Sequence, residues 1–195
     1  MEMNGEYRIE ASREKVWSAL NDAEILKQSI PGCEEINRLS ETEMTATVVA
    51  KVGPVKAKFT GQVTLSDLNP PNSYRISGEG KGGAAGFAKG GANVSLQSDG
   101  NSTILIYSVD ATVGGKLAQL GARLIDGTAK KLAGEFFTNF ADIVSDSSSA
   151  DNKNIESDNI KTNNINELSR PLIGMGTWIG GLIVLAVVLL AIAYS

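Results

Sequence analysis

Three carboxylates, Glu79, Asp110 and Asp126, and one thiol, Cys33, are candidates in this sequence for acid–base or nucleophilic chemistry. The chain has no histidine, which removes the usual general base, the usual zinc ligand and the partner of a Ser/His or Cys/His dyad. The carboxylates show no recognisable catalytic spacing, so we interpret them as solvated or helix-surface groups. A single cysteine allows no internal disulfide, and we interpret Cys33 as a small buried hydrophobe rather than a reactive thiol.

A glycine-rich segment, residues 78–83, has the sequence Gly-Glu-Gly-Lys-Gly-Gly and matches the G-x-G-x-x-G pattern of dinucleotide-binding proteins. In those proteins the pattern joins a strand to a helix whose N-terminus holds the pyrophosphate. Here GGAAGFAKGG runs directly into another apparent strand, so the required helix cannot follow. We therefore predict no dinucleotide site. The missing histidine and the spacing of the carboxylates lead us to predict no catalytic residue and no metal site.

Short apolar segments separated by turn residues predict the elements that position these groups. The expected strands are 3–9, 35–40, 43–52, 55–68, 73–80, 90–97 and 103–113. Ser12 is expected to cap one short helix after the first strand, and a second should cover 23–28. A long helix is expected over 116–144, where leucine and phenylalanine recur at helical spacing. The short connections make the strands an antiparallel meander.

This order of elements predicts an α+β fold of the helix-grip type. In it a curved antiparallel sheet wraps around the long C-terminal helix and leaves an apolar cavity between them. Glycines inside the expected helix, Gly121, Gly127 and Gly134, each cost about 1 kcal/mol relative to alanine. Either close packing on the sheet or room for a ligand would offset this cost. Inward-facing positions predict a cavity or cavity mouth lined by Ile30, Phe59, Phe87, Leu117, Leu120 and Leu124.

Alternate turns of a meander lie at the same end of the sheet, which predicts an uneven distribution of charge. The turns at Gly53-Pro54, 84–87 and Gly114-Gly115 should share one end, with small or apolar tips flanked by lysines. The opposite turns are polar and acidic. The first end suits contact with anionic headgroups or a deformable portal, against the alternative of ordinary turns with solvated lysines. The residues expected to contact a membrane or partner are Lys51, Val52, Val55, Lys56, Lys81, Lys89 and Lys116.

The C-terminal part of the chain has a different composition. Residues 1–145 are expected to form the ligand-binding domain, and 146–170, rich in Asn and Ser, a disordered linker. Residues 171–195 carry no charge, and the 22 positions from 172 to 193 are long enough for a single transmembrane helix. The first ten residues contain no apolar run, so we expect no signal peptide and a domain that stays in the cytoplasm. The net charge of −4 does not favour nucleic-acid binding.

Four segments, IPGC, VGPVKAKFTGQVTLSDL, GEGKGGAAGFAKGGANV and VGGKLAQLGARLIDGTAKK, closely resemble the CoxG family of carbon monoxide dehydrogenase subunits, within the START-like, Bet v 1-like (SRPBCC) superfamily. The resemblance covers essentially residues 1–144. It implies a non-catalytic accessory protein of a molybdenum-containing carbon monoxide dehydrogenase. That role is linked to holding the enzyme at the bacterial cytoplasmic membrane and to carrying a respiratory quinone to it.

The same resemblance implies no covalent cofactor, with a quinone or other lipid as a non-covalent hydrophobic ligand. Two alternatives stay open on the sequence. One is a pure membrane adaptor without a ligand. The other is an enzyme of the cyclase or hydrolase type, because the superfamily contains both and fold alone does not exclude catalysis.

Overall fold

The computed structural model describes residues 2–151 and the side chains of residues 2–145. The strands are β1 (Glu2–Ile9), β2 (Cys33–Arg38), β3 (Glu43–Val52), β4 (Val55–Asn69), β5 (Ser73–Lys81), β6 (Phe87–Asp99) and β7 (Ser102–Gly114). The helices are α1 (Arg13–Ala19), α2 (Ala23–Ser29) and α3 (Ala122–Asp151), with 3₁₀ turns η1 (Gly83–Ala85) and η2 (Leu117–Leu120).

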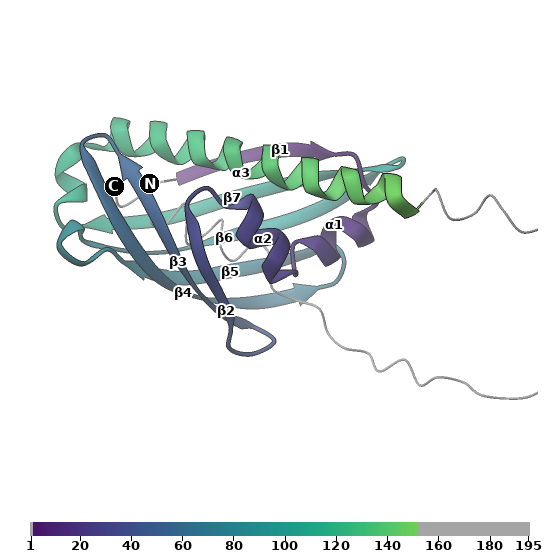
Figure 1. Cartoon of the computed structure of the whole chain (residues 1–195), viewed down its shortest axis with the longest axis horizontal. Coiled ribbons are helices and arrows are strands. Elements are labelled where there is room, and N and C mark those ends of the chain that lie inside the picture. Colours follow the sequence, from purple (N-terminus) through teal and green to yellow (C-terminus); the bar gives the residue numbers. More distant parts are fainter. Residues whose placement is uncertain (1, 152–195) are drawn as a thin grey trace, which may run out of the picture.

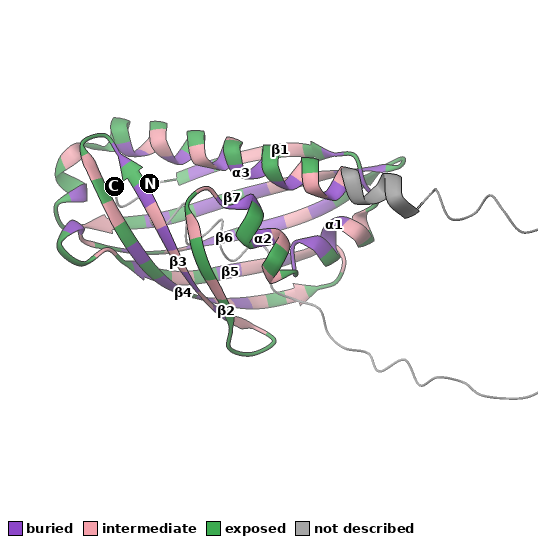
Figure 2. Cartoon of the chain, in the orientation of Figure 1, coloured by how far each residue is buried: buried purple, intermediate pink, exposed green. Residues whose placement is uncertain are grey.

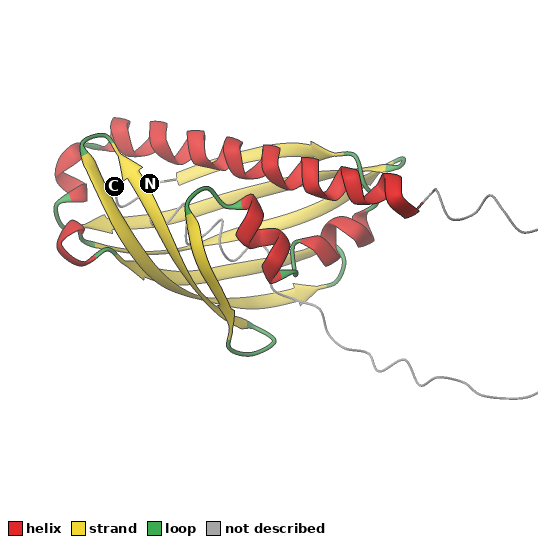
Figure 3. Ribbon diagram, viewed as in Figure 1, coloured by secondary structure: helices red, strands yellow, loops and turns green. Residues whose placement is uncertain are grey.

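The strands form one antiparallel sheet in the order β1-β7-β6-β5-β4-β3-β2, so the predicted meander is confirmed. The first strand forms one edge of the sheet and pairs with the last strand, from Glu2 opposite Asp110 to Ile9 opposite Thr103. The sheet curves around α3, which lies along its inner face (Figures 1 and 3). The helices α1 and α2 cover the sheet near the end where α3 finishes.

Local side chains explain where the two short helices begin. Ser12 precedes α1, and its hydroxyl accepts a hydrogen bond from the Lys15 amide. Asp22 precedes α2 and accepts from the amides of Glu24 and Ile25 at 2.8 and 3.0 Å. Each cap satisfies amide groups that have no partner inside the helix, which fixes the start of the helix.

The long C-terminal helix differs from its prediction at both ends. Gly121, with φ of 89°, interrupts the expected helix over 116–144, so that a separate 3₁₀ turn precedes α3. A residue other than glycine rarely adopts this backbone conformation, which explains the break. At its other end α3 continues to Asp151, so the first residues of the expected linker are helical.

The expected transmembrane segment and the rest of the linker lie outside the described residues. Within the part of the chain that is described, no helix is long and apolar enough to cross a membrane. Among the described side chains, the last buried member of the core is Val144.

The core between sheet and helix has two unlike halves. Burial alternates along the strands and concentrates on the sides of the sheet and of α3 that face each other (Figure 2). Toward the end covered by α1, large rings fill this space, and Tyr7 stacks on Phe137 with ring centroids 3.9 Å apart. The other rings of this half are Trp17, Tyr74, Tyr107, Phe136 and Phe140. Toward the end where α3 begins, the inner positions of the sheet are mostly glycine and alanine.

Candidate functional site

Three connections meet at the end of the sheet where α3 begins: the β3–β4 turn, the β5–β6 connection through η1, and the β7–η2 connection. Phe87 pairs with Lys81 on one side and with Gly114 on the other, so the β5–β6 connection and the β7–η2 connection lie side by side. Their backbones touch, because a Cβ atom added at Gly115 would lie 2.6 Å from the Cα of Gly86. The β3–β4 turn meets α3, since a Cβ at Gly53 would lie 2.8 Å from a methyl carbon of Leu124. The predicted sharing of one end by these turns is confirmed, and we call this region the glycine-rich end.

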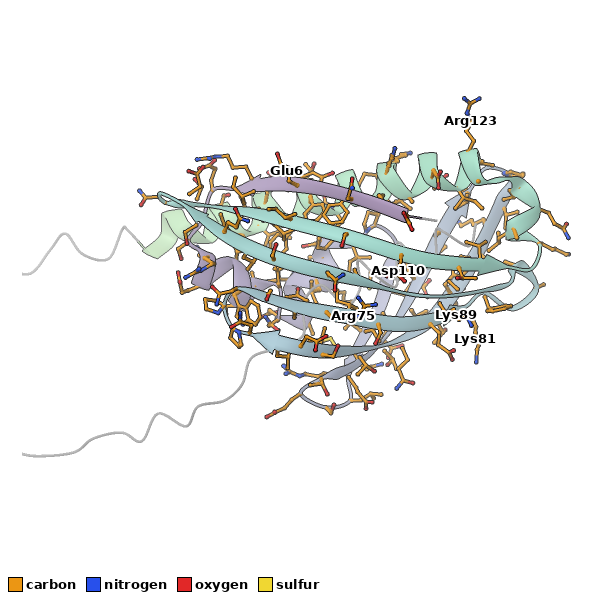
Figure 4. The ribbon with its side chains drawn as sticks, turned by 180° about the vertical axis from the view of Figure 1, so that it is seen from behind. Glu6, Arg75, Lys81, Lys89, Asp110 and Arg123 are labelled. Atoms are coloured by element: carbon orange, nitrogen blue, oxygen red, sulfur yellow. The ribbon has the colours of Figure 1, made fainter. Side chains whose placement is uncertain are left out.

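Cations surround the glycine-rich end. All five predicted lysines are exposed: Lys51, Lys56, Lys81, Lys89 and Lys116. Lys81 forms an ion pair with Glu79 at 3.4 Å. Figure 4 shows Lys81, Lys89 and Arg123 toward this end, with Arg123 extending outward from α3. Arg123 was absent from the predicted set, although its position in the first turn of α3 brings it to the same end.

The apolar residues of this end do not all reach its surface. Phe87 and Leu124 are 51% and 39% exposed, and they are two of the three exposed large hydrophobic residues in the described part of the chain. Val55 is half-buried. Val52 is fully buried, so its predicted surface contact is wrong. Its side chain lies on the inner face because alternate residues of a strand point to opposite sides.

Small residues form the inner wall of the sheet next to the glycine-rich end. They are Gly61 on β4, Gly78 and Gly80 on β5, Ala88, Gly90 and Ala92 on β6, and Ala111 on β7. After Ile125, the next buried residues of α3 are also small, namely Ala129 and Ala133. At Gly80 an added Cβ would approach nothing closer than 3.9 Å, so there is space at this position, whereas a Cβ at Gly78 would lie 2.5 Å from Val63. The wall therefore presents backbone and methyl surface on the inner face of the sheet, with room for an added side-chain atom at Gly80.

A pocket of about 360 Å³ opens beside this wall, between the end of β7, η2 and the start of α3. Its lining is Ala111, Thr112, Val113, Ala118, Ala122, Ile125 and Asp126. Among the described residues, the pairing of β1 with β7 extends as far as Glu2 opposite Asp110. A mostly apolar hollow of this size, with few polar groups, is typical of sites for small hydrophobic molecules.

The six residues predicted to line the cavity occupy different environments. Ile30, Phe59 and Leu117 are buried, and the Phe59 ring lies against Gly82 at the end of β5. Leu120 is half-buried, whereas Phe87 and Leu124 are exposed at the glycine-rich end. None of the six lines the pocket beside β7, although Leu117 and Leu124 each precede one of its lining residues in the sequence.

Neither the small-residue wall nor the pocket beside β7 was predicted from the sequence. The signal for the wall was present as a period of two, because glycine or alanine occupies 78 and 80 on β5 and 88, 90 and 92 on β6. A buried strand face is usually identified from large apolar residues at alternate positions. Glycine at alternate positions is more typical of turns, so the small face was not identified from the sequence.

The carboxylates considered for catalysis lie apart from one another. Glu79 is exposed and paired with Lys81, and Asp126 lies at the pocket beside β7. Asp110 is on the outer face of the sheet, where Arg75 reaches it at 3.7 Å (Figure 4). The Arg75 guanidinium crosses β6 over Gly91, where no side chain intervenes. These three carboxylates do not converge on a common site.

The remaining groups considered in the sequence are accounted for structurally. Cys33 is half-buried, and burial raises the pKa of its thiol, which favours the unreactive protonated form. The glycine run 78–83 ends β5 and enters η1, so the helix required for dinucleotide binding is not formed. In residues 2–151 no group of three or more histidine, cysteine or carboxylate side chains is placed to hold a metal ion.

Comparison with known proteins gives a family and a fold. The family model for the G subunit of carbon monoxide dehydrogenase (CoxG) matches residues 5–145. A crystal structure of a conserved protein from Geobacillus kaustophilus is 31% identical, with a TM-score of 0.71 over 75% of this chain and 97% of that one. No curated protein matches. Because nearly all of the Geobacillus chain is matched, a domain of this extent folds without a counterpart of the remaining quarter.

More distant structures share only the fold. A START superfamily protein from Mycobacterium smegmatis is 15% identical, with a TM-score of 0.59 over 74% of this chain and 97% of that chain. The Zhui aromatase/cyclase from Streptomyces sp. R1128 is 11% identical, with a TM-score of 0.55 over 74% of this chain and 93% of that chain. The architecture is therefore START-like. With the family match over most of its length, this chain belongs to the CoxG family of carbon monoxide dehydrogenase subunits.

Proposed function

We propose that this protein is a non-catalytic, membrane-tethered accessory protein of a molybdenum-containing carbon monoxide dehydrogenase, and that it binds a hydrophobic ligand, a respiratory quinone. The observation that carries the ligand-binding part is the small-residue wall under α3, together with the apolar pocket beside β7. Family membership supports the partner, because the family is named for a component of that enzyme.

The space between the wall and α3 suits a flat ring followed by an apolar chain. Glycine and alanine offer backbone and methyl surface but no polar side chain, so a polar ligand would lose its hydration there without gaining hydrogen bonds. The aromatic half of the core closes the space at its far end. A ligand would therefore enter from the glycine-rich end, where the pocket opens.

The uncharged segment 172–193 supports the tether, since it is long enough to cross the apolar part of a bilayer. It would hold the domain on the cytoplasmic side of a bacterial membrane, close to the lipid in which a quinone dissolves. The dehydrogenase would then be recruited to the same surface. No covalent cofactor takes part in this role.

Ligand binding is tested by lipid extraction from the purified full chain, followed by mass spectrometry, and by titration with decylubiquinone. Gly80→Leu places a large side chain in the space above the wall and should lower decylubiquinone affinity at least tenfold. Ser77→Leu is the matched control, because Ser77 lies on the outer face of the same strand and should leave affinity unchanged. If no lipid is recovered and decylubiquinone does not bind, the carrier role is contradicted.

Recruitment is tested separately in cells that make the dehydrogenase. Deleting residues 152–195 should move the enzyme from the membrane fraction to the supernatant while its activity with an artificial electron acceptor persists. If the enzyme stays on the membrane after the deletion, the tether does not recruit it. If the truncated protein also restores quinone-coupled oxidation when added back, ligand delivery rather than anchoring is the main role.

A further inference from the structure

The glycine-rich end carries cations in two places where the fold itself disfavours them. Lys51 and Lys56 are direct partners in the β3–β4 register, and like charges placed opposite each other destabilise a sheet. Arg123 is the second residue of α3, where the positive end of the helix dipole repels a cation. No acidic residue occupies that first turn.

These cations have no compensating partner in the described part of the chain. Lys51, Lys56, Lys89, Lys116 and Arg123 form no ion pair among residues 2–145, whereas Lys58, two residues beyond Lys56, is paired with Glu34 at 2.7 Å. Local conflicts of this kind occur where a sequence serves function rather than stability. An external anionic surface would relieve both of them.

The apolar residues of the same end indicate which anionic surface fits. Phe87 and Leu124 are exposed at the same end as the lysines, since Phe87 pairs with Gly114 and Leu124 precedes the pocket residue Ile125. An aromatic or aliphatic side chain flanked by lysines is the arrangement by which proteins insert into the headgroup region of a bilayer. A purely electrostatic contact with an acidic protein would not require exposed Phe87.

From these observations we infer that the glycine-rich end docks on an anionic phospholipid bilayer, with Phe87 and Leu124 in the interface and Lys51, Lys56, Lys89, Lys116 and Arg123 against the headgroups. The inference deepens the proposed function. It rests on that function only for the identity of the ligand that would pass between the bilayer and the domain. Docking in this orientation turns the opening beside β7 toward the lipid.

The position of the expected anchor is compatible with this orientation. The helix α3 is about 45 Å long and carries the chain to the opposite end of the domain. About 20 residues separate its end from the uncharged segment, and they reach about 70 Å when extended. The segment between them is therefore long enough for the glycine-rich end to face the bilayer that holds the anchor.

The test uses residues 1–151, which contain every core residue found among the described side chains, and vesicles of phosphatidylcholine with or without one quarter phosphatidylglycerol. Sedimentation should show binding to the anionic vesicles that weakens as salt is raised, with little binding to phosphatidylcholine alone. Each lysine contributes about a fivefold factor, so Lys51→Gln with Lys56→Gln should weaken binding roughly 30-fold. The matched control, Lys15→Gln with Lys27→Gln, removes the same charge on α1 and α2 at the other end of the domain and should change binding less than about threefold.

A second measurement reports the orientation directly. Phe87→Trp should show a blue shift of tryptophan fluorescence on adding anionic vesicles, whereas Leu39→Trp, at the exposed β2–β3 turn, should show none. Equal binding to neutral vesicles, an unchanged double lysine variant, or a blue shift at both positions overturns the inference. The inference is also overturned if the unaltered protein does not bind vesicles while the double lysine variant no longer co-purifies with the dehydrogenase. That result would make the glycine-rich end a protein interface.

Failure of this inference differs from failure of the proposed function. The double lysine variant keeps the wall and the pocket, so its affinity for decylubiquinone in detergent should equal that of the unaltered protein. Vesicle binding without any quinone binding would leave docking intact and remove the carrier role. Quinone binding without vesicle binding would leave the carrier role intact and remove docking.

Discussion

Lys51 and Lys56 face each other directly across the β3–β4 hairpin, one residue pair before its Gly53-Pro54 turn. Both side chains are exposed and neither forms an ion pair within the described residues. Two positive charges in directly opposed positions weaken a hairpin whose remaining pairs are mostly apolar or neutral. Stability and membrane docking therefore place opposite demands on these two positions.

Reversing one of these charges should stabilise the domain. Lys56→Glu converts a repelling pair into an attracting one, and the free energy of unfolding should rise by about 0.2–1 kcal/mol at low salt. Urea denaturation of residues 1–151 measures this change. Lys58→Glu is the control on the same strand, and it should lower the free energy because Lys58 is paired with Glu34. A loss of stability in Lys56→Glu would contradict the repulsion inferred from the register.

Charge at the start of α3 should act in the same direction. In the series Arg123, Arg123→Gln and Arg123→Glu, each step improves the interaction with the helix dipole, and the full change should stabilise the domain by about 0.3–1 kcal/mol at low ionic strength. The gain should shrink in about 0.5 M salt. Vesicle binding should fall along the same series. A flat series in stability at low salt would show that the dipole is already screened at this site.

Two glycines on the inner face of β5 should respond in opposite ways to alanine. Gly80→Ala adds a methyl group that meets nothing closer than 3.9 Å, and it should be neutral or stabilise by up to about 1 kcal/mol. Gly78→Ala would place its methyl group 2.5 Å from a methyl carbon of Val63, and it should destabilise by about 1–3 kcal/mol. Denaturation midpoints of the pair compare them directly. Similar losses in both would mean that the space above Gly80 is filled.

The contact between η1 and the end of β7 depends on Gly86. Its φ is 132°, and an added Cβ would collide with the carbonyl oxygen of Gly114. Gly86→Ala should therefore destabilise the domain by about 2 kcal/mol or more and speed amide hydrogen exchange in residues 82–90. Gly83→Ala, in a left-handed turn with open space around it, should cost only about 1 kcal/mol. Equal costs at both positions would indicate that the two connections do not touch.

Alkaline pH should destabilise the domain through Tyr107. Burial raises the pKa of this phenol to about 12, so the folded state keeps its proton where an unfolded tyrosine ionises at about 10. The contribution to stability is complete below about pH 10 and is lost as the pH rises toward 12. Unfolding free energies at about pH 9, 10 and 11 should decline more steeply in the unaltered protein than in Tyr107→Phe. Parallel declines would assign the effect to other groups.

Much of this architecture is determined locally and could be predicted from the sequence. Alternation of apolar residues and short turn segments predicted the seven strands. Ser12 predicted the start of α1, the helix expected over 23–28 is α2, and most of the helix expected over 116–144 is α3. The shared end of the three connections followed from the parity of a meander. The family resemblance, now shown over residues 5–145, rested on whole segments of sequence rather than on any single residue.

Only the tertiary structure decided how the site is divided. Burial of Val52, the break at Gly121, and the place of Arg123 beside the lysines depend on how the β3–β4 hairpin, η2 and α3 meet in space. The small-residue wall is likewise a property of neighbouring strands in register: a glycine on β5 has no special meaning until Gly61 stands opposite Gly80 and no side chain fills the gap. Residue types set which face of each strand is small, and only the pairing of neighbouring strands brings those small faces together into one surface.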